Sequence, residues 1–185
     1  MSEVTHILCR VQEGDPKAVE ELLPLVYEEL RRLAGARLAS LPPGQTLQPT
    51  ALVHDAWLRL VGAGPQDWNS RGHFFSAAAE AMRRILVERA RQKASRKRGG
   101  GFQRVDWEHA DIAVDTDDEL VLALDAALGR YAEKDPMGAE LIKLRFFVGL
   151  PNHQAAALLD IPERTAKRTW AYARAWLFSE IQKSL

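Results

Sequence analysis

The sequence predicts an all-α protein built from two small helical domains joined by a flexible linker. Apolar residues recur at spacings of three and four through most of the 185 residues, and no convincing pair of strands appears. Three consecutive glycines at residues 99–101 interrupt this pattern, and the irregular stretch after them becomes acidic. The last part of the chain carries two helices around a tight turn. We expect a first domain at residues 1–97, a linker at residues 98–116 and a second domain at residues 117–185.

Four helices are expected in the first domain. The first ends near Gly14, and the second covers residues 16–41, where Pro24 should kink the helix or lie near its start. The third covers residues 50–61 and stacks apolar side chains on one face. The fourth covers residues 73–97; one face is apolar and the other is rich in arginine.

The second domain should begin with two helices separated by an Asp-Pro pair at residues 135–136, because proline is favoured in a first helical turn. Residues 152–177 then read as a helix, a turn at residues 160–162 and a longer basic helix. Ala156 is small where the two helices should cross. Such a pair is typical of a helix-turn-helix whose second helix enters the major groove. The side chains expected to reach bases or phosphates are Arg164, Thr165, Lys167 and Arg168.

Charge is segregated along a chain whose formal net charge is zero. Basic residues dominate residues 83–104, and acidic residues dominate residues 106–119. The arginine cluster follows an aromatic stretch, so one segment combines phosphate-binding charge with rings that could hold an unstacked base. The alternative is a solvated arginine face above ordinary core aromatics, which we favour for Phe75.

Composition argues against several other classes. Cys9 is the single cysteine and lies on an apolar stripe, so we expect a buried, inert thiol and no intramolecular disulfide. The five histidines do not cluster at metal-ligand spacing, and we expect no metal and no cofactor. No phosphate-binding loop or nucleophile motif is visible, which disfavours an enzyme. No long apolar run or secretory signal appears, so the expected location is the cytoplasm, without a membrane partner.

Four segments together resemble extracytoplasmic-function (ECF) sigma factors of the sigma-70 family, over nearly the whole chain. GDPKAVEELLPLVYEELRRLA is similar to the opening helix pair of that family, and LVHDAWLRLV to its most recognisable segment. RGHFFSAAAEAMRRILVERARQK resembles the segment that melts and reads the minus-ten promoter element. RTAKRTWAYARAWL resembles the closing pattern. The usual turn glycine of the family is Asp160 here, and the usual Trp-Leu pair of the promoter-reading helix is Ala77-Ala78.

The resemblance implies a sigma region 2-like bundle followed by a sigma region 4-like helix-turn-helix. It implies that the protein binds the clamp and flap of core RNA polymerase and places the enzyme on promoter DNA. Many family members are also held by an anti-sigma factor, so such a partner is compatible with the resemblance. The implied minus-35 contacts are those of the basic helix, and the implied minus-ten contacts are Trp68, Arg71, His73, Arg83, Arg84 and Arg91. The implied polymerase contacts are His54, Asp55, Trp57 and Arg59.

Two other functions are compatible with parts of the pattern. A stand-alone helix-turn-helix regulator would bind duplex DNA without polymerase, usually as a dimer on a palindromic site. A helical adaptor would bind only protein, with little dependence on salt. Neither gives a clear role to both LVHDAWLRLV and the aromatic loop beside the arginine helix.

Overall fold

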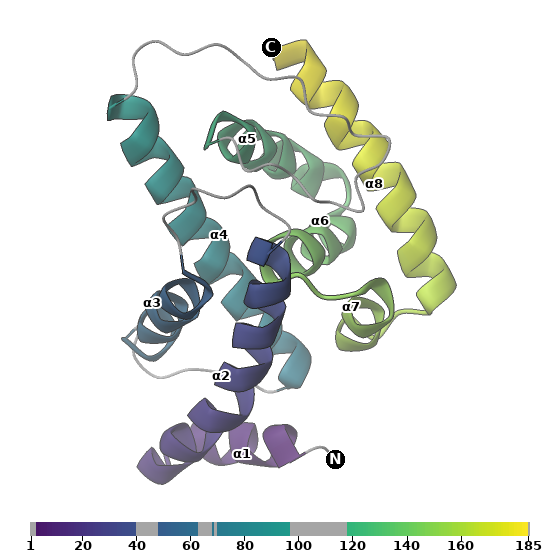
Figure 1. Cartoon of the computed structure of the whole chain (residues 1–185). Coiled ribbons are helices and arrows are strands. Elements are labelled where there is room, and N and C mark those ends of the chain that lie inside the picture. The colour runs from purple at the N-terminus through teal and green to yellow at the C-terminus, as the bar shows by residue number, and fades with distance from the viewer. Residues whose placement is uncertain (1–2, 40–47, 63–67, 69, 97–117, 185) are drawn as a thin grey trace.

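The computed structural model describes residues 3–39, 48–62, 68, 70–96 and 118–184, and all regular secondary structure in these ranges is helical (Figure 1). This confirms the all-α prediction. The helices are α1 (Glu3–Gln12), α2 (Pro16–Ala39), α3 (Pro49–Gly62), α4 (Arg71–Arg96), α5 (Asp118–Lys134), α6 (Pro136–Lys143), the π-helical segment η1 (Leu144–Val148), α7 (Asn152–Leu158) and α8 (Glu163–Ser184).

A tight corner joins α1 to α2. Gly14 takes the left-handed conformation, with φ of 82°, which glycine adopts without a Cβ clash. Arg10 then bridges the corner, with ion pairs of 2.6 Å to Asp15 and 2.5 Å to Glu21. Pro24 lies inside α2, so this proline is accommodated within a continuous helix rather than starting one.

The first half of the chain packs α2, α3 and α4 around an apolar core, with α1 laid against α2. The side chains of Leu22, Val26, Phe74, Phe75 and Met82 are fully buried there. The prediction that Phe75 is a core residue is therefore confirmed. Cys9 is half-buried, so it is less enclosed than its position on the apolar stripe suggested.

The second half begins with a capped helix pair. Asp135 is the N-cap of α6, and its carboxylate accepts hydrogen bonds from the Gly138 amide at 2.8 Å and the Tyr131 hydroxyl at 3.2 Å. After α6 the backbone widens into η1, which ends at Gly149 with φ of 88°. The sequence predicted a helix in this region but gave no sign of the π-helical turn.

The predicted helix-turn-helix is present as α7 and α8. Ala156 and Ala166 are almost fully buried where the two helices pack together. Asp160 takes the left-handed conformation in the turn, with φ of 52°. The Ile161 amide donates to the Ala156 carbonyl at 3.0 Å, which ties the turn to the end of α7.

The two halves pack against each other along α4. This helix contacts α3 on one side and α5, α6, η1 and α7 on the other, and one apolar cluster continues across the boundary (Figure 1). A second, smaller cluster joins Val87 and Ala90 of α4 to Val121 of α5. The expected linker lies outside the described residues, and the division into two domains stays a prediction.

Candidate nucleic-acid interface

The first turns of α8 present a basic face. Arg164, Lys167 and Arg168 are exposed, and Thr165 is half-buried beside them. Lys167 forms an ion pair of 2.8 Å with Glu163, and this hydrogen bond lowers the pKa of the Glu163 carboxyl. An exposed pair of this kind contributes little stability, so Lys167 can leave this carboxylate at small cost.

Aromatic and cationic contacts hold α8 on its base. The Arg145 guanidinium lies 3.9 Å from the centre of the Trp170 ring. Further along, the Trp176 ring packs 5.2 Å from the ring of Tyr131 on α5, and Lys134 lies 5.0 Å from the same tryptophan ring. The basic face is therefore carried by a helix whose opposite side is fixed by packing.

The aromatic stretch before α4 is mostly core. The Trp68 ring is only 3% exposed and meets Phe74 edge to face, with ring centres 5.2 Å apart. In this arrangement Trp68 does not present a stacking surface to solvent. His73 is exposed in the first turn of α4, where its backbone amide donates to Ser70 Oγ at 3.1 Å.

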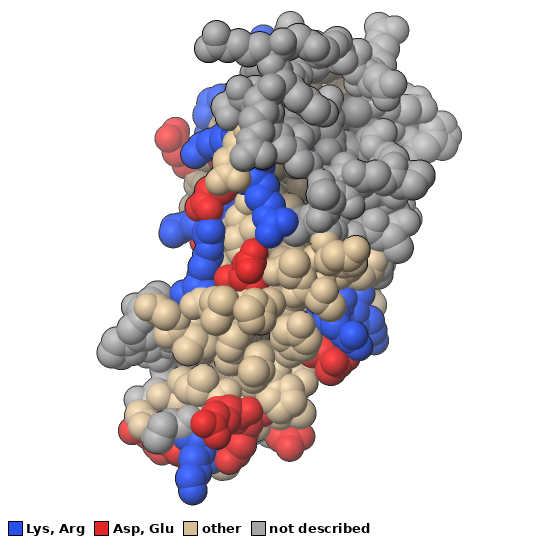
Figure 2. All heavy atoms as spheres, turned by 60° about the vertical axis from the view of Figure 1, so that its left-hand side comes forward, with Lys and Arg blue, Asp and Glu red and all other residues tan. Residues whose placement is uncertain are grey.

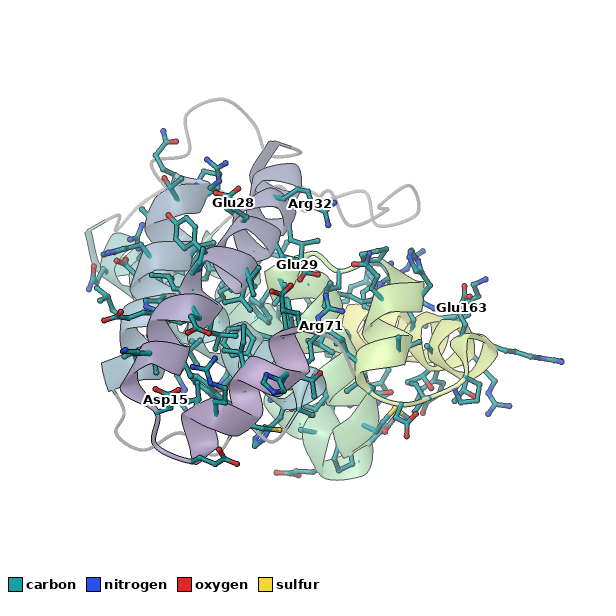
Figure 3. All side chains as sticks on the ribbon, turned by 90° about the horizontal axis from the view of Figure 1, so that it is seen from below. Asp15, Glu28, Glu29, Arg32, Arg71 and Glu163 are labelled. Carbon is teal, nitrogen blue, oxygen red and sulfur yellow. The ribbon has the colours of Figure 1, made fainter. Side chains whose placement is uncertain are left out.

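Arg71 lies at the boundary between the two halves. It forms an ion pair with Glu29 of α2, and its guanidinium lies 5.2 Å from the centre of the Phe75 ring. Figure 3 shows Arg71 and Glu29 together between the helices of the first half and those of the second. Glu163, at the start of α8, lies well away from this pair in the same view. The two expected DNA-binding regions are therefore separate surfaces.

The arginines of α4 are engaged with carboxylates. Arg83 pairs with Glu80 at 2.8 Å and with Asp125 of α5, and Arg91 lies 3.8 Å from the same aspartate. Arg84 is exposed and pairs with Glu80 at 2.9 Å. Figure 2 shows one face of the molecule, on which blue and red side chains lie beside each other around a large tan area.

Glu80 is at the centre of this network. Burial opposes its ionisation, but hydrogen bonds from Arg83 and Arg84 outweigh that cost and lower its pKa to about 2. Lys143 of α6 approaches the other Glu80 oxygen at 3.3 Å. The carboxylate therefore links α4 to the second half of the chain.

The residues expected to bind polymerase lie on α3. His54 and Arg59 are exposed and Asp55 is half-buried, but Trp57 is 8% exposed and belongs to the core. The surface also contains charges from α4, because Arg89 pairs with Asp55 at 2.9 Å. Glu88 pairs with Arg59 at 2.5 Å, and hydrogen bonds from that arginine lower the pKa of the glutamate.

Sequence reasoning missed several residues of these surfaces. Leu58 and Val61 are apolar yet 55% and 40% exposed on α3. A helical projection of LVHDAWLRLV against its buried residues could have found Leu58. The contacts of Asp125 with Arg83 and of Lys143 with Glu80 carry no local signal, because each joins residues more than forty positions apart in the sequence.

No group of side chains suited to a metal ion occurs in the described part of the chain. Over the same residues, no helix is long and apolar enough to cross a membrane.

Comparison with known proteins bears on the whole chain. A family model described as ECF sigma factor matches residues 1–183. A search of curated proteins finds no match.

Proposed function

The chain belongs to the family of ECF sigma factors, and from this premise we propose which of its surfaces meet the promoter and the polymerase. Membership implies promoter recognition together with core RNA polymerase, and no catalysis by the chain itself.

The start of α8 reads the minus-35 element. The observation that carries this assignment is the exposed set Arg164, Lys167 and Arg168, on a helix that Ala156 and Ala166 hold against α7. Arginine can donate two hydrogen bonds to a guanine edge in the major groove. Thr165 lies beside them and would contact a phosphate or a base. The second half of the chain also contacts the polymerase flap.

The start of α4 and its arginine-bearing face bind the minus-ten element. Arg71, His73, Arg83, Arg84 and Arg91 lie along this helix and supply the charge that a separated strand requires. Trp68 supports the site from behind, through its edge contact with Phe74.

The polymerase clamp docks on α3 through His54, Asp55 and Arg59. Trp57 shapes this surface from the core, and exposed Leu58 adds apolar area beside the charged residues. An anti-sigma factor is a further partner that the family resemblance allows.

Run-off transcription with core polymerase on a library of genomic promoters tests the proposal. The unaltered protein should create new, sequence-specific start sites. Arg168→Ala should weaken promoter binding by about 10- to 100-fold, the equivalent of about 1–3 kcal/mol, while binding to core polymerase is retained. Lys183→Ala removes one charge from the far end of α8 and serves as the matched control. Equal activity of both variants would overturn the minus-35 assignment.

A further inference from the structure

We propose that the second half of the chain inhibits the first, with Asp125 of α5 occupying the arginines of α4 in the place of a promoter phosphate. The inference rests on the proposed minus-ten role of Arg83 and Arg91. It adds a regulatory contact that the role itself does not require.

The charges at the boundary between the halves are complementary. Asp125 is 16% exposed and receives two cations, Arg83 and the tip of Arg91, whose nearest nitrogen lies 3.8 Å away. Lys143 of α6 reaches Glu80 of α4 at 3.3 Å. A carboxylate and a phosphate offer arginine the same pair of anionic oxygens. The N–H groups of Arg83 that donate to Asp125 therefore cannot donate to a DNA phosphate at the same time.

Apolar packing closes the same boundary around the ion pairs. Val87 and Ala90 of α4 are 4% and 1% exposed, and they pack with Val121, one turn before Asp125 on α5. A DNA strand lying along this face of α4 would have to displace α5. The contact thus blocks the arginine face sterically as well as electrostatically.

Close backbone packing fixes the other end of α4. A Cβ added at Gly72 would overlap the backbone carbonyl oxygen of Leu158, at the end of α7. Gly72 follows Arg71 at the start of α4, so both ends of the proposed minus-ten surface are held against the second half. Only glycine permits this approach without displacement of one helix.

The closed arrangement is too small to serve both promoter elements. Elements about 25 base pairs apart are separated by about 85 Å, since B-DNA rises about 3.4 Å per base pair. A compact chain of this length has a radius of gyration of about 16 Å. Binding both elements therefore requires the halves to separate, which frees Arg83 and Arg91 from Asp125.

Two unrelated substitutions test whether this contact holds the chain closed. Asp125→Asn removes the charge, and Gly72→Ala creates the steric overlap without changing any charge. Their matched controls are Glu133→Gln, an exposed position on α5, and Gly129→Ala, where an added Cβ meets no atom within 4 Å. Circular dichroism and thermal melting establish that each full-length variant is folded.

Spin labels report the separation of the halves. In a Cys9→Ser background, labels at Leu58→Cys on α3 and Gln182→Cys on α8 occupy exposed positions in different halves. We expect one short distance in the parent and in both controls. Asp125→Asn and Gly72→Ala should shift the population to longer distances. If Asp125→Asn and Gly72→Ala, the two opening variants, both keep the parent distance, these contacts do not hold the halves together.

Binding of DNA reports inhibition separately. The probe is a short fluorescein-labelled single strand of DNA of random sequence. The proteins in this experiment carry no spin label and retain Cys9. Both opening variants should bind it several-fold more tightly than the parent and the controls. A longer distance without tighter binding would overturn inhibition. Tighter binding that Arg83→Ala and Arg91→Ala leave unchanged would instead overturn the minus-ten assignment, so the two failures are distinguishable.

Discussion

The backbone conformation of one residue, Asp160, determines how α8 is oriented on α7. Asp160 is the one described residue other than glycine with positive φ, at 52°, and it lies in the turn that orients α8 on α7. Side chains with a Cβ are strained in this region, although aspartate tolerates it better than most. Asp160 stands where similar sequences usually have glycine. The left-handed conformation is thus kept without the residue type that favours it.

Asp160→Gly should therefore raise the free energy of unfolding by about 0.5–1 kcal/mol, because relief of left-handed strain exceeds the added chain entropy. Asp160→Val should lower it by about 1–2 kcal/mol, because a β-branched residue is more strained there. Urea unfolding measures both. Ala126→Gly, at an exposed position in the interior of α5, is the control and should lower the free energy of unfolding by about 1 kcal/mol. If Asp160→Gly lowers the free energy of unfolding as the control substitution does, the backbone at Asp160 is not strained.

Glu80 makes the packing of α4 sensitive to acid. Its pKa is lowered from 4.5 to about 2 in the folded chain, so the folded state favours the ionised form. A lowered carboxyl pKa contributes stability that is fully present above pH 4.5 and is lost as the pH falls toward 2. At neutral pH a shift of this size corresponds to about 3 kcal/mol. Because the side chain is 26% exposed, solvent screening reduces this contribution to about 2 kcal/mol.

Glu80→Gln should remove that part of the acid dependence and lower the free energy of unfolding at neutral pH by about 2 kcal/mol. Urea unfolding at a series of pH values between 7 and about 2 measures the slope. Glu163→Gln is the comparison, since its lowered pKa comes from one exposed pair with Lys167 and should matter much less. Equal slopes for Glu80→Gln and the parent would refute the role of the network.

At the scale of elements, the angle between α7 and α8 depends on two small residues. Ala166 of α8 is fully buried and Ala156 of α7 is 2% exposed, and the two helices pack together. Larger side chains at such a crossing force the helices apart.

Ala166→Leu should lower the free energy of unfolding by about 1–3 kcal/mol and reduce promoter binding more than binding to core polymerase. Ala175→Leu places the same side chain at an exposed position of α8 and should be nearly neutral. Thermal melting and promoter-binding titrations measure the two effects. Unchanged promoter binding by Ala166→Leu would show that the reading surface does not depend on this crossing.

Helical periodicity predicted the elements well because each amphipathic segment carries its own signal. The apolar positions of residues 50–61 and the small residues of the helix-turn-helix were identified in this way. Trp57 and Trp68 were expected at the polymerase and minus-ten contacts, and both are buried in the structure. The sequence does not separate the two cases, because a tryptophan near a charged segment suits a core and an interface equally. The pairing of Arg83 with Asp125 could not be predicted, since no local pattern specifies a contact between distant helices.

At the scale of the whole molecule, the zero net charge has a structural counterpart. The basic face of α4 meets carboxylates from its own helix and from α5, so positive charge is neutralised within the fold. The apolar cluster that runs from α2 through α4 to α5 and α8 acts in the same direction. Both observations favour a compact free chain that must open to work.

Small-angle scattering of the free protein should therefore give a radius of gyration near the value for one compact body, about 16 Å for a chain of this length. Gly72→Ala should increase it by several ångströms, because the added Cβ overlaps the Leu158 carbonyl and separates α4 from α7. Gly129→Ala, with open space around it, should leave the curve unchanged. High salt should expand the parent as well, since it screens the pairs of Asp125 and Lys143, but it should have little further effect on Gly72→Ala, whose halves are already apart. An extended particle for the parent at low salt would mean that the contacts along α4 do not hold the free chain closed.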